Sequence, residues 1–417
     1  MNTFTVLFLI ALAAGTVLKW WLAGRQLSSV AGHRDQVPEA FRESIRLETH
    51  QNAADYTAAK TRAAIVETGI AALLLLAWTL GGGIDLLSSL WAATGLSPLL
   101  AGTGLLLSIF LIMGLLEMPF DIYRTFFIEE RFGFNRTTPR LFIADGIKQA
   151  VLLITLGAPV ILLVLWLMAH AGTRWWLYVW IVWMSFSLLL TWAYPALIAP
   201  WFNKFLPLDD GALKARIESL LERNGFATQG IFVVDGSKRS GHGNAYFTGL
   251  GNNKRIVFFD TLLRQLDGDE IEAVLAHEIG HFKRKHIAKR IALMALLSLA
   301  ALMLLGWLIN MPWFYSGLGV TQPSVAVALL LFLLVVPTFT VFVQPLMSAL
   351  SRRHEFEADE FAAAQADAGK LVKALVKLYR ENANTLTPDP LYSAFYDSHP
   401  PAPVRIANLQ AKQVATG

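Results

Sequence analysis

Two histidines and a glutamate in one short segment have the spacing of a hydrolytic metal site. Residues 276–281 read Ala-His-Glu-Ile-Gly-His, so His277 and His281 lie four positions apart. On an α-helix this spacing puts both imidazoles on one face, close enough to bind a single Zn²⁺. Glu278 projects beside them, where a carboxylate can take a proton from a metal-bound water. The pattern predicts a metal-dependent hydrolase. The alternative is a helix that merely carries two surface histidines.

The residues before this motif predict the helix that it requires. Asp269 and Glu270 open an amphipathic run, and the helix dipole favours acidic residues in a first turn. The chain contains no cysteine, so a zinc site must use histidine and carboxylate ligands. Because catalytic zinc sites use three protein ligands and a water molecule, one further ligand is needed.

We expect the third ligand in the segment 353–359, which reads Arg-His-Glu-Phe-Glu-Ala-Asp. Glu355 and Asp359 lie four residues apart and share a helix face, whereas Glu357 points elsewhere. We assign Glu355 as the ligand, and Asp359 as the acceptor of a hydrogen bond from the second nitrogen of a ligating histidine. Two alternatives stay open: a solvated charged helix face, and His354 as the ligand.

The composition is that of a polytopic membrane protein. Of the 417 residues, 55% are hydrophobic and 16% are charged, whereas soluble proteins carry about 25% charged residues. Seven apolar segments approach the roughly twenty residues that cross a bilayer. They are residues 4–22, 64–80, 99–116, 150–170, 175–199, 291–309 and 325–346.

Lysine and arginine concentrate in alternate connections between these segments. The loops after the first, third, fifth and seventh spans hold nearly all of them, and the other connections contain only Arg174. Basic loops favour the cytoplasm, which places the His-Glu-x-x-His segment on that side. We expect a bacterial inner (plasma) membrane, or the endoplasmic reticulum membrane in a eukaryote. The net charge of +4 follows from this topology and does not indicate nucleic acid as a partner.

The predicted fold is an α-helical multi-pass membrane protein with a small α+β zincin-like metalloprotease domain. Residues 1–203 contain five transmembrane helices with cytoplasmic loops, and residues 204–290 form the cytoplasmic segment with the motif. Residues 291–350 contain two more transmembrane helices, and residues 351–417 form a C-terminal cytoplasmic segment that completes the site. Smaller expected elements are a helix at 211–224, strands at 231–235, 244–249 and 255–260, and a helix at 351–382.

In its motifs and its number of spans, the chain resembles the type I CaaX prenyl proteases, a family of integral-membrane gluzincin metalloproteases. His-Glu-x-x-His followed by Glu-Phe-x-Ala-Asp at 355–359 carries the resemblance. Three further segments contribute: Phe-Ile-Glu-Glu-Arg-Phe-Gly-Phe-Asn-Arg-Thr-Thr at 127–138, Arg-Ser-Gly-His-Gly-Asn-Ala-Tyr-Phe at 239–247, and Ser-His-Pro-Pro at 398–401. The family often has Asn four residues before the ligand Glu, where this chain has Ser351.

The resemblance implies a role for each matching residue. Glu278 would be the general base, and His399 would stabilise the oxyanion of the transition state. We expect Arg405 to orient the loop that carries His399. By itself, a histidine in a proline-rich segment is more often a solvated loop residue. The resemblance also implies one Zn²⁺ per chain.

Asn244, Ala245 and Tyr246 resemble the edge strand along which such proteases lay the substrate backbone. Without the resemblance, an ordinary core strand is the simpler interpretation. His242 lies near that edge, and we do not expect it to be a ligand. The implied partners are the lipid bilayer and a peptide or protein substrate, prenylated in this family; the sequence does not define an oligomeric state.

Several acidic residues lie outside the motif. We expect Glu129 and Glu130 to form ion pairs with Arg131 or Arg136, with a place along the site as the alternative. Glu67, Glu117 and Asp121 lie in or at the ends of spans, where carboxylates face a bundle interior or a watery cavity.

The first functional hypothesis is a zinc endopeptidase that cleaves near the membrane, like proteases that remove the last three residues of prenylated CaaX tails. A membrane-protein quality-control protease is the nearest alternative. A transporter with a structural zinc site is the alternative from another class, although the chain shows no internal repeat.

Overall fold

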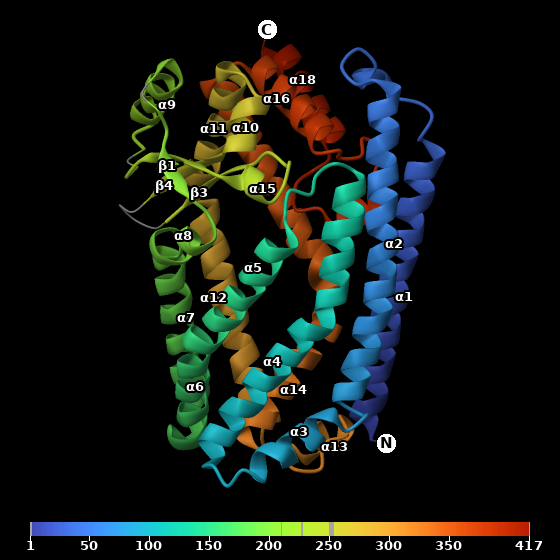
Figure 1. Cartoon of the computed structure of the whole chain (residues 1–417), viewed down its shortest axis with the longest axis vertical. Helices are drawn as coiled ribbons and strands as arrows, with labels where there is room; N and C mark the ends of the chain where they lie inside the picture. The colour runs from blue at the N-terminus through green and yellow to red at the C-terminus, as the bar shows by residue number, and fades with distance from the viewer. Residues whose placement is uncertain (1, 210, 227, 250–253, 417) are drawn as a thin grey trace.

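Long apolar helices form the body of the molecule in the computed structural model, which describes residues 2–209, 211–226, 228–249 and 254–416 (Figure 1). Among these residues, seven helical segments are long and apolar enough to cross a membrane. They are Thr3–Gly32, Leu47–Trp78, Pro98–Glu129, Pro139–His170, Gly172–Phe202, His286–Leu308 and Val325–Gln365. Each overlaps one predicted span, so the expectation of seven is confirmed.

The spans are longer than their apolar runs because the helices continue past the apolar stretch. Short 3₁₀ or π turns divide four of them, so several spans contain more than one element. In chain order these are α1 (Thr3–Gly32), α2 (Leu47–Trp78), α4 (Pro98–Tyr123), η2 (Arg124–Glu129), α5 (Pro139–Leu152), η3 (Leu153–Gly157), α6 (Ala158–His170), η4 (Gly172–Arg174), α7 (Trp175–Ala193), η5 (Tyr194–Ile198), α8 (Ala199–Phe202), α12 (His286–Leu308), α14 (Val325–Thr340), η7 (Val341–Val343) and α15 (Gln344–Gln365).

The centre of the bundle is α14. Its residues Val327, Leu330 and Leu331 are fully buried, and the helix contacts α1, α4, α6 and α12. Two short helices close the end of the bundle that carries the N-terminus, α3 (Gly83–Ala92) and α13 (Pro312–Gly317). Because helices pair their backbone groups internally, such a bundle can face lipid on its outside.

A cavity of about 590 Å³ lies inside the bundle, between α1, α2, α4 and α14. Glu67 and Glu117 line it together with Lys19 and Arg124. Arg124 forms ion pairs with Glu67 at 2.8 Å and with Asp121 at 2.6 Å. The predicted interior position of Glu67 and Glu117 therefore agrees with the structure, and Asp121 is paired beside them.

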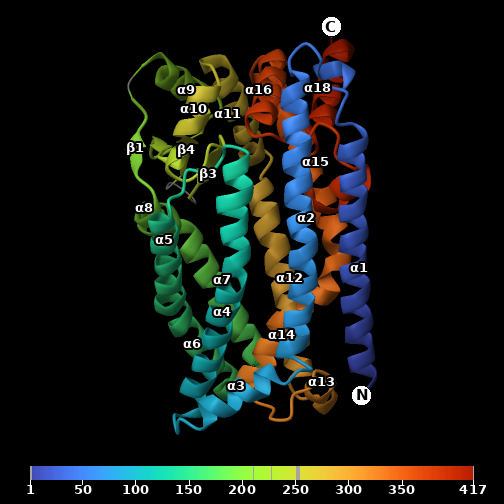
Figure 2. The ribbon, with the colours of Figure 1, turned by 45° about the vertical axis from the view of Figure 1, so that its right-hand side comes forward.

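A four-stranded sheet lies at the opposite end of the bundle from α3 and α13, as both views show (Figures 1 and 2). Its order is β1-β2-β4-β3, in which β2 and β4 are parallel and the other pairs are antiparallel. The strands are β1 (Phe205–Pro207), β2 (Ile231–Val234), β3 (Ala245–Thr248) and β4 (Arg255–Phe259). Three strands match the prediction to within a residue. The three-residue β1 was missed because it is too short to show a pattern.

Helices pack around this sheet to complete a second core. They are α9 (Ala212–Arg223), α10 (Asp260–Gln265), α11 (Gly268–Lys283), α16 (Ala368–Glu381), α17 (Pro390–Tyr396) and α18 (Ala402–Thr416); η1 (Glu39–Phe41) and η6 (Gly236–Lys238) are single 3₁₀ turns. The core joins Ile217 of α9, Phe258 of β4, Ile279 of α11 and Ala374 of α16, all fully buried. Burial on this scale fixes α11 against the sheet.

The single helix predicted at 351–382 is wrong. The seventh span continues through η7 into α15, which ends at Gln365, and α16 starts at Ala368. Ala366 has an extended backbone, and the Asp367 side chain accepts a hydrogen bond from Gly369 N as the N-cap of α16. This break separates the helix that carries Glu355 from the helix that covers α11.

Candidate active site

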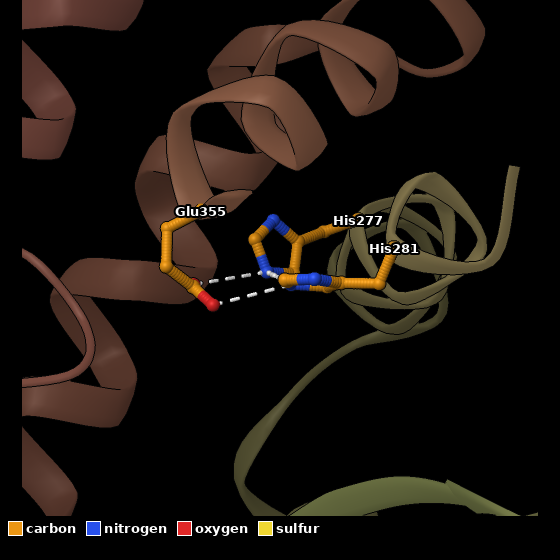
Figure 3. Close-up of side chains that lie close together, drawn as sticks. All are labelled: His277, His281 and Glu355. Carbon is orange, nitrogen blue, oxygen red and sulfur yellow. Dashed lines mark hydrogen bonds and ion pairs between the residues drawn. The ribbon is translucent and has the colours of Figure 1, made fainter. Parts of the chain in front are cut away.

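Three side chains from two helices converge on one point. His277 and His281 project from α11 and Glu355 from α15, and the three face one another (Figure 3). Nε2 of His277 lies 3.2 Å from Nε2 of His281 and 3.4 Å from Oε2 of Glu355. Nε2 of His281 lies 3.2 Å from Oε1 of Glu355. Among the described residues, this is the one cluster of such groups with the proximity of a metal site.

These separations suit a tetrahedral metal ion. Ligand atoms about 2.0–2.1 Å from a tetrahedral Zn²⁺ lie roughly 3.3 Å from one another, and the three measured separations are 3.2, 3.4 and 3.2 Å. Oε2 of Glu355 is buried and accepts no well-oriented hydrogen bond from the described residues, although Nδ1 of His399 lies 2.7 Å away. The donor set therefore fits a metal ion that would satisfy this oxygen.

Close packing of α11 against α15 brings the three groups together. Gly280 makes this approach possible, because a Cβ at that position would lie 3.0 Å from both Cα and the carbonyl oxygen of Ala358. Ordinary contacts of this kind are longer, so a side chain here would push the helices apart. The glycine within the motif thus sets the distance between the histidines and Glu355.

Asp359 and Arg405 orient the ring of His277 from the side of its Nδ1 atom. Its Nδ1 lies 2.8 Å from Oδ1 of Asp359, and Arg405 binds the same carboxylate through Nη2 at 2.5 Å and Nε at 2.8 Å. Burial lowers the pKa of His277, but the neighbouring carboxylates of Asp359 and Glu355 outweigh this effect and raise the pKa to about 9. With its Nδ1 proton donated to Asp359, the ring presents Nε2 to the cluster.

A cavity of about 650 Å³ opens beside the cluster. Glu278, His281 and Glu355 line it, together with His399 from the segment between α17 and α18. The edge strand β3 forms another part of its wall through Tyr246, Phe247 and Thr248. The site therefore combines the His277–His281–Glu355 cluster, the Glu278 carboxylate, the His399 imidazole and a strand edge around one space.

Known proteins match both halves of this chain. Residues 26–204 match the family described as CAAX prenyl protease N-terminal, five membrane helices, and residues 207–413 match peptidase family M48. The CAAX prenyl protease 1 homolog of Arabidopsis thaliana is 40% identical over 303 residues, which cover 72% of this chain and 71% of that protein. The chain belongs to the CAAX prenyl protease 1 family of M48 peptidases.

The similarity to this family extends over nearly the whole length. The Caenorhabditis elegans CAAX prenyl protease 1 homolog is 31% identical over 437 residues, covering 98% of each protein. The crystal structure of S. mikatae Ste24p superimposes with a TM-score of 0.89 at 31% identity, covering 98% of this chain and 99% of that one. The chain is therefore an integral-membrane metalloprotease, and the transporter hypothesis is wrong.

The substrate-binding residues expected in this M48 protease lie at the edge of its sheet. Ala245 and Tyr246 belong to β3, which among the described residues pairs only with β4, and Asn244 directly precedes it. The carbonyl of Asn244 accepts a hydrogen bond from Phe259 N. Burial raises the pKa of Tyr246 to about 12, so its phenol stays neutral. Tyr246, Phe247 and Thr248 line the cavity, and no strand in the described part of the chain pairs with the other side of β3.

Arg405 does not hold the His399 loop as expected, because its guanidinium is committed to Asp359. Arg352 of α15 contacts this loop instead: its Nη1 donates to the carbonyls of Ala394 at 3.0 Å and Asp397 at 2.9 Å. One signal was available before the structure: Arg352 is a second arginine beside Arg353 in the segment that carries Glu355. Only the chain reversal after α17 shows which carbonyls it reaches.

Glu129 and Glu130 also have other partners than expected. Glu129 accepts a hydrogen bond from the Tyr56 hydroxyl at 2.5 Å and lies 3.3 Å from Nε2 of His242. Glu130 accepts from the side chain of Asn135 at 2.9 Å. Arg131 and Arg136 are not their partners, because the π turn η2 directs Glu129 inward toward α2. His242 therefore contacts Glu129 and Tyr56 and is not part of the His277–His281–Glu355 cluster.

Proposed function

We propose that this protein is a zinc-dependent endopeptidase that removes the C-terminal tripeptide from prenylated CaaX tails. The observation that carries the proposal is the meeting of His277, His281 and Glu355 at one wall of a cavity that Glu278, His399 and β3 also line. The names of its relatives, CAAX prenyl protease 1, support the substrate class.

His277, His281 and Glu355 would hold one Zn²⁺, since two imidazoles and a carboxylate at these separations form a common catalytic zinc ligand set. When bound, the ion supplies Lewis acidity, which lowers the pKa of water and polarises the carbonyl of the substrate. Asp359 and Arg405 hold His277 in the tautomer that such binding requires.

Glu278 has the position of a general base. It follows His277 directly and lines the cavity, so its carboxylate can accept a proton from the attacking water and return it to the leaving amine. His399 stands at the same cavity with its side chain 66% exposed and can donate a hydrogen bond to the oxyanion that develops on the substrate.

The substrate would bind as an additional strand. We place it along Asn244, Ala245 and Tyr246 of the β3 edge, where outward-facing backbone groups can pair with an extended peptide. Tyr246 lines the cavity, whereas the Asn244 carbonyl is already paired with Phe259 N, so Ala245 and its neighbours along β3 would supply the free groups. This mode recognises backbone rather than side chains, so discrimination between substrates would rest on groups outside the strand.

The orientation in the membrane follows from charge. The sheet lies at the same end of the bundle as the basic connections between α1 and α2 and between η2 and α5. Because basic loops favour the cytoplasm, we place the site on the cytoplasmic face of a bacterial plasma membrane, or of the endoplasmic reticulum in a eukaryote.

The test combines metal analysis with cleavage of a farnesylated CaaX peptide and its unmodified counterpart. Purified Glu278→Gln should retain one zinc ion per chain and lose about 10²–10⁴-fold in kcat, whereas Glu222→Gln on the exposed side of α9 should match the parent protein. Zinc-loaded protein that cleaves neither peptide contradicts the proposal. Equal cleavage of both peptides rejects prenyl recognition and favours a quality-control protease.

A further inference from the structure

We propose that His286 and Glu357 are positioning residues that hold the metal ligand His281 in its binding tautomer and orientation. This inference rests on the proposed function, because it takes His281 to be a ligand. Both residues lie outside the ligand set and outside the groups that the proposed reaction uses.

The contacts form a chain that leads away from the cluster. Nδ1 of His281, on the side of the ring opposite its cluster-facing nitrogen, lies 3.0 Å from Nδ1 of His286. Nε2 of His286 lies 3.0 Å from Oε2 of Glu357. The other oxygen of Glu357 accepts a hydrogen bond from Arg353 Nε at 3.1 Å. The chain therefore links α11, the start of α12 and α15.

Only one placement of the ring protons on His281 and His286 leaves Nε2 of His281 free to bind a metal ion. An ionised Glu357 is an acceptor only, so Nε2 of His286 must donate to it. In a neutral imidazole the other nitrogen then carries a lone pair, so Nδ1 of His286 accepts. His281 must donate from its own Nδ1, which leaves its Nε2 deprotonated and directed at His277 and Glu355.

A strained backbone conformation at Lys285 places His286 in this arrangement. Lys285, between α11 and α12, has φ +57°, a left-handed conformation that is unfavourable for a side chain other than glycine. This turn starts α12 at His286, whose side chain is almost fully buried at 4% exposure. The ring of His354 stacks on it at 4.1 Å and 13°, which fixes the plane of the imidazole.

Each of the two histidine ligands would thus be oriented by a carboxylate that an arginine holds in place. His277 reaches Asp359 directly, and Arg405 holds that carboxylate. His281 reaches Glu357 through the ring of His286, and Arg353 holds that carboxylate. Partners of this kind typically contribute 10–100-fold to metal affinity.

The experiment measures Zn²⁺ affinity of the purified full chain by competition with a chromophoric chelator. We expect Glu357→Leu and His286→Phe to weaken binding by about 10–100-fold. Glu357→Gln should recover most of this loss, because its amide oxygen still accepts a hydrogen bond from His286. Glu222→Leu on the exposed side of α9 is the matched control for Glu357→Leu and should bind Zn²⁺ within about twofold of the parent protein.

Two results separate this inference from the proposed function. If His281→Ala binds Zn²⁺ as the parent does, the ligand assignment fails and the inference with it. If His281→Ala loses binding while Glu357→Leu and His286→Phe retain it within twofold, only the inference is overturned. The visible spectrum of the Co²⁺-loaded protein gives a second measurement, since Glu357→Leu should alter the ligand-field bands and Glu357→Gln should restore them.

Discussion

Replacing Gly280 with alanine tests whether close contact between α11 and α15 sets the geometry of the metal site. The new Cβ would lie 3.0 Å from Cα and the carbonyl oxygen of Ala358 and 3.1 Å from Cβ of Phe361. These neighbours are backbone and Cβ atoms, so they cannot rotate away. Relief to an ordinary contact distance requires α15 to move by about 0.5 Å.

That displacement exceeds what the ligand set tolerates. Metal–ligand distances must stay within about 0.2 Å of their preferred values, and Glu355 is on the helix that moves. We therefore expect Gly280→Ala to weaken Zn²⁺ binding by about tenfold or more. Overpacking costs about 1–3 kcal/mol, and the better helix propensity of alanine returns about 1 kcal/mol, so the fold should survive with a slightly lower unfolding temperature.

The assay is a Zn²⁺ titration of the parent protein, Gly280→Ala and the control Gly146→Ala. Gly146 lies in α5 with no atom within 4 Å of an added Cβ, so its substitution should leave affinity unchanged. Parental Zn²⁺ affinity in Gly280→Ala would refute the reasoning that this contact sets the position of Glu355.

Three further predictions concern the groups around the site. Because the pKa of His277 is raised to about 9, metal binding must displace a proton from this ring. Apparent Zn²⁺ affinity should therefore rise by up to tenfold per pH unit toward pH 9. Zn²⁺ titrations at pH 6.5, 7.5 and 8.5 measure this dependence, and an affinity that does not change with pH contradicts it. The same shift stabilises the metal-free fold below about pH 6.5, and this contribution should be lost as pH rises through 9, which thermal unfolding of chelator-treated protein measures. Arg352→Met removes the donor to the carbonyls of Ala394 and Asp397, so kcat should fall by about tenfold or more while the Zn²⁺ content stays unchanged. Arg352→Lys should recover part of the lost kcat. An unchanged kcat in Arg352→Met would show that other contacts hold the His399 loop.

The sequence by itself determined what depends on local pattern. Apolar length defined all seven spans, and the spacing of His277 and His281 placed two proposed ligands on one helix face, since both properties follow from helix geometry alone. Periodicity also located three strands, but β1 escaped because three residues carry too little pattern. The break at Ala366 escaped because both flanking segments have strong helix formers.

Tertiary structure decided which distant groups meet. Arg405 and Arg352 are both cations near the predicted site, and only the path of the chain after α17 shows that the first binds Asp359 and the second binds the His399 loop. Likewise, Glu357 is one more acidic residue in the sequence, and it reaches His281 only because the left-handed turn at Lys285 brings His286 between them. Local sequence fixes the direction of each side chain on its own helix, whereas the partner that it meets depends on how the helices pack.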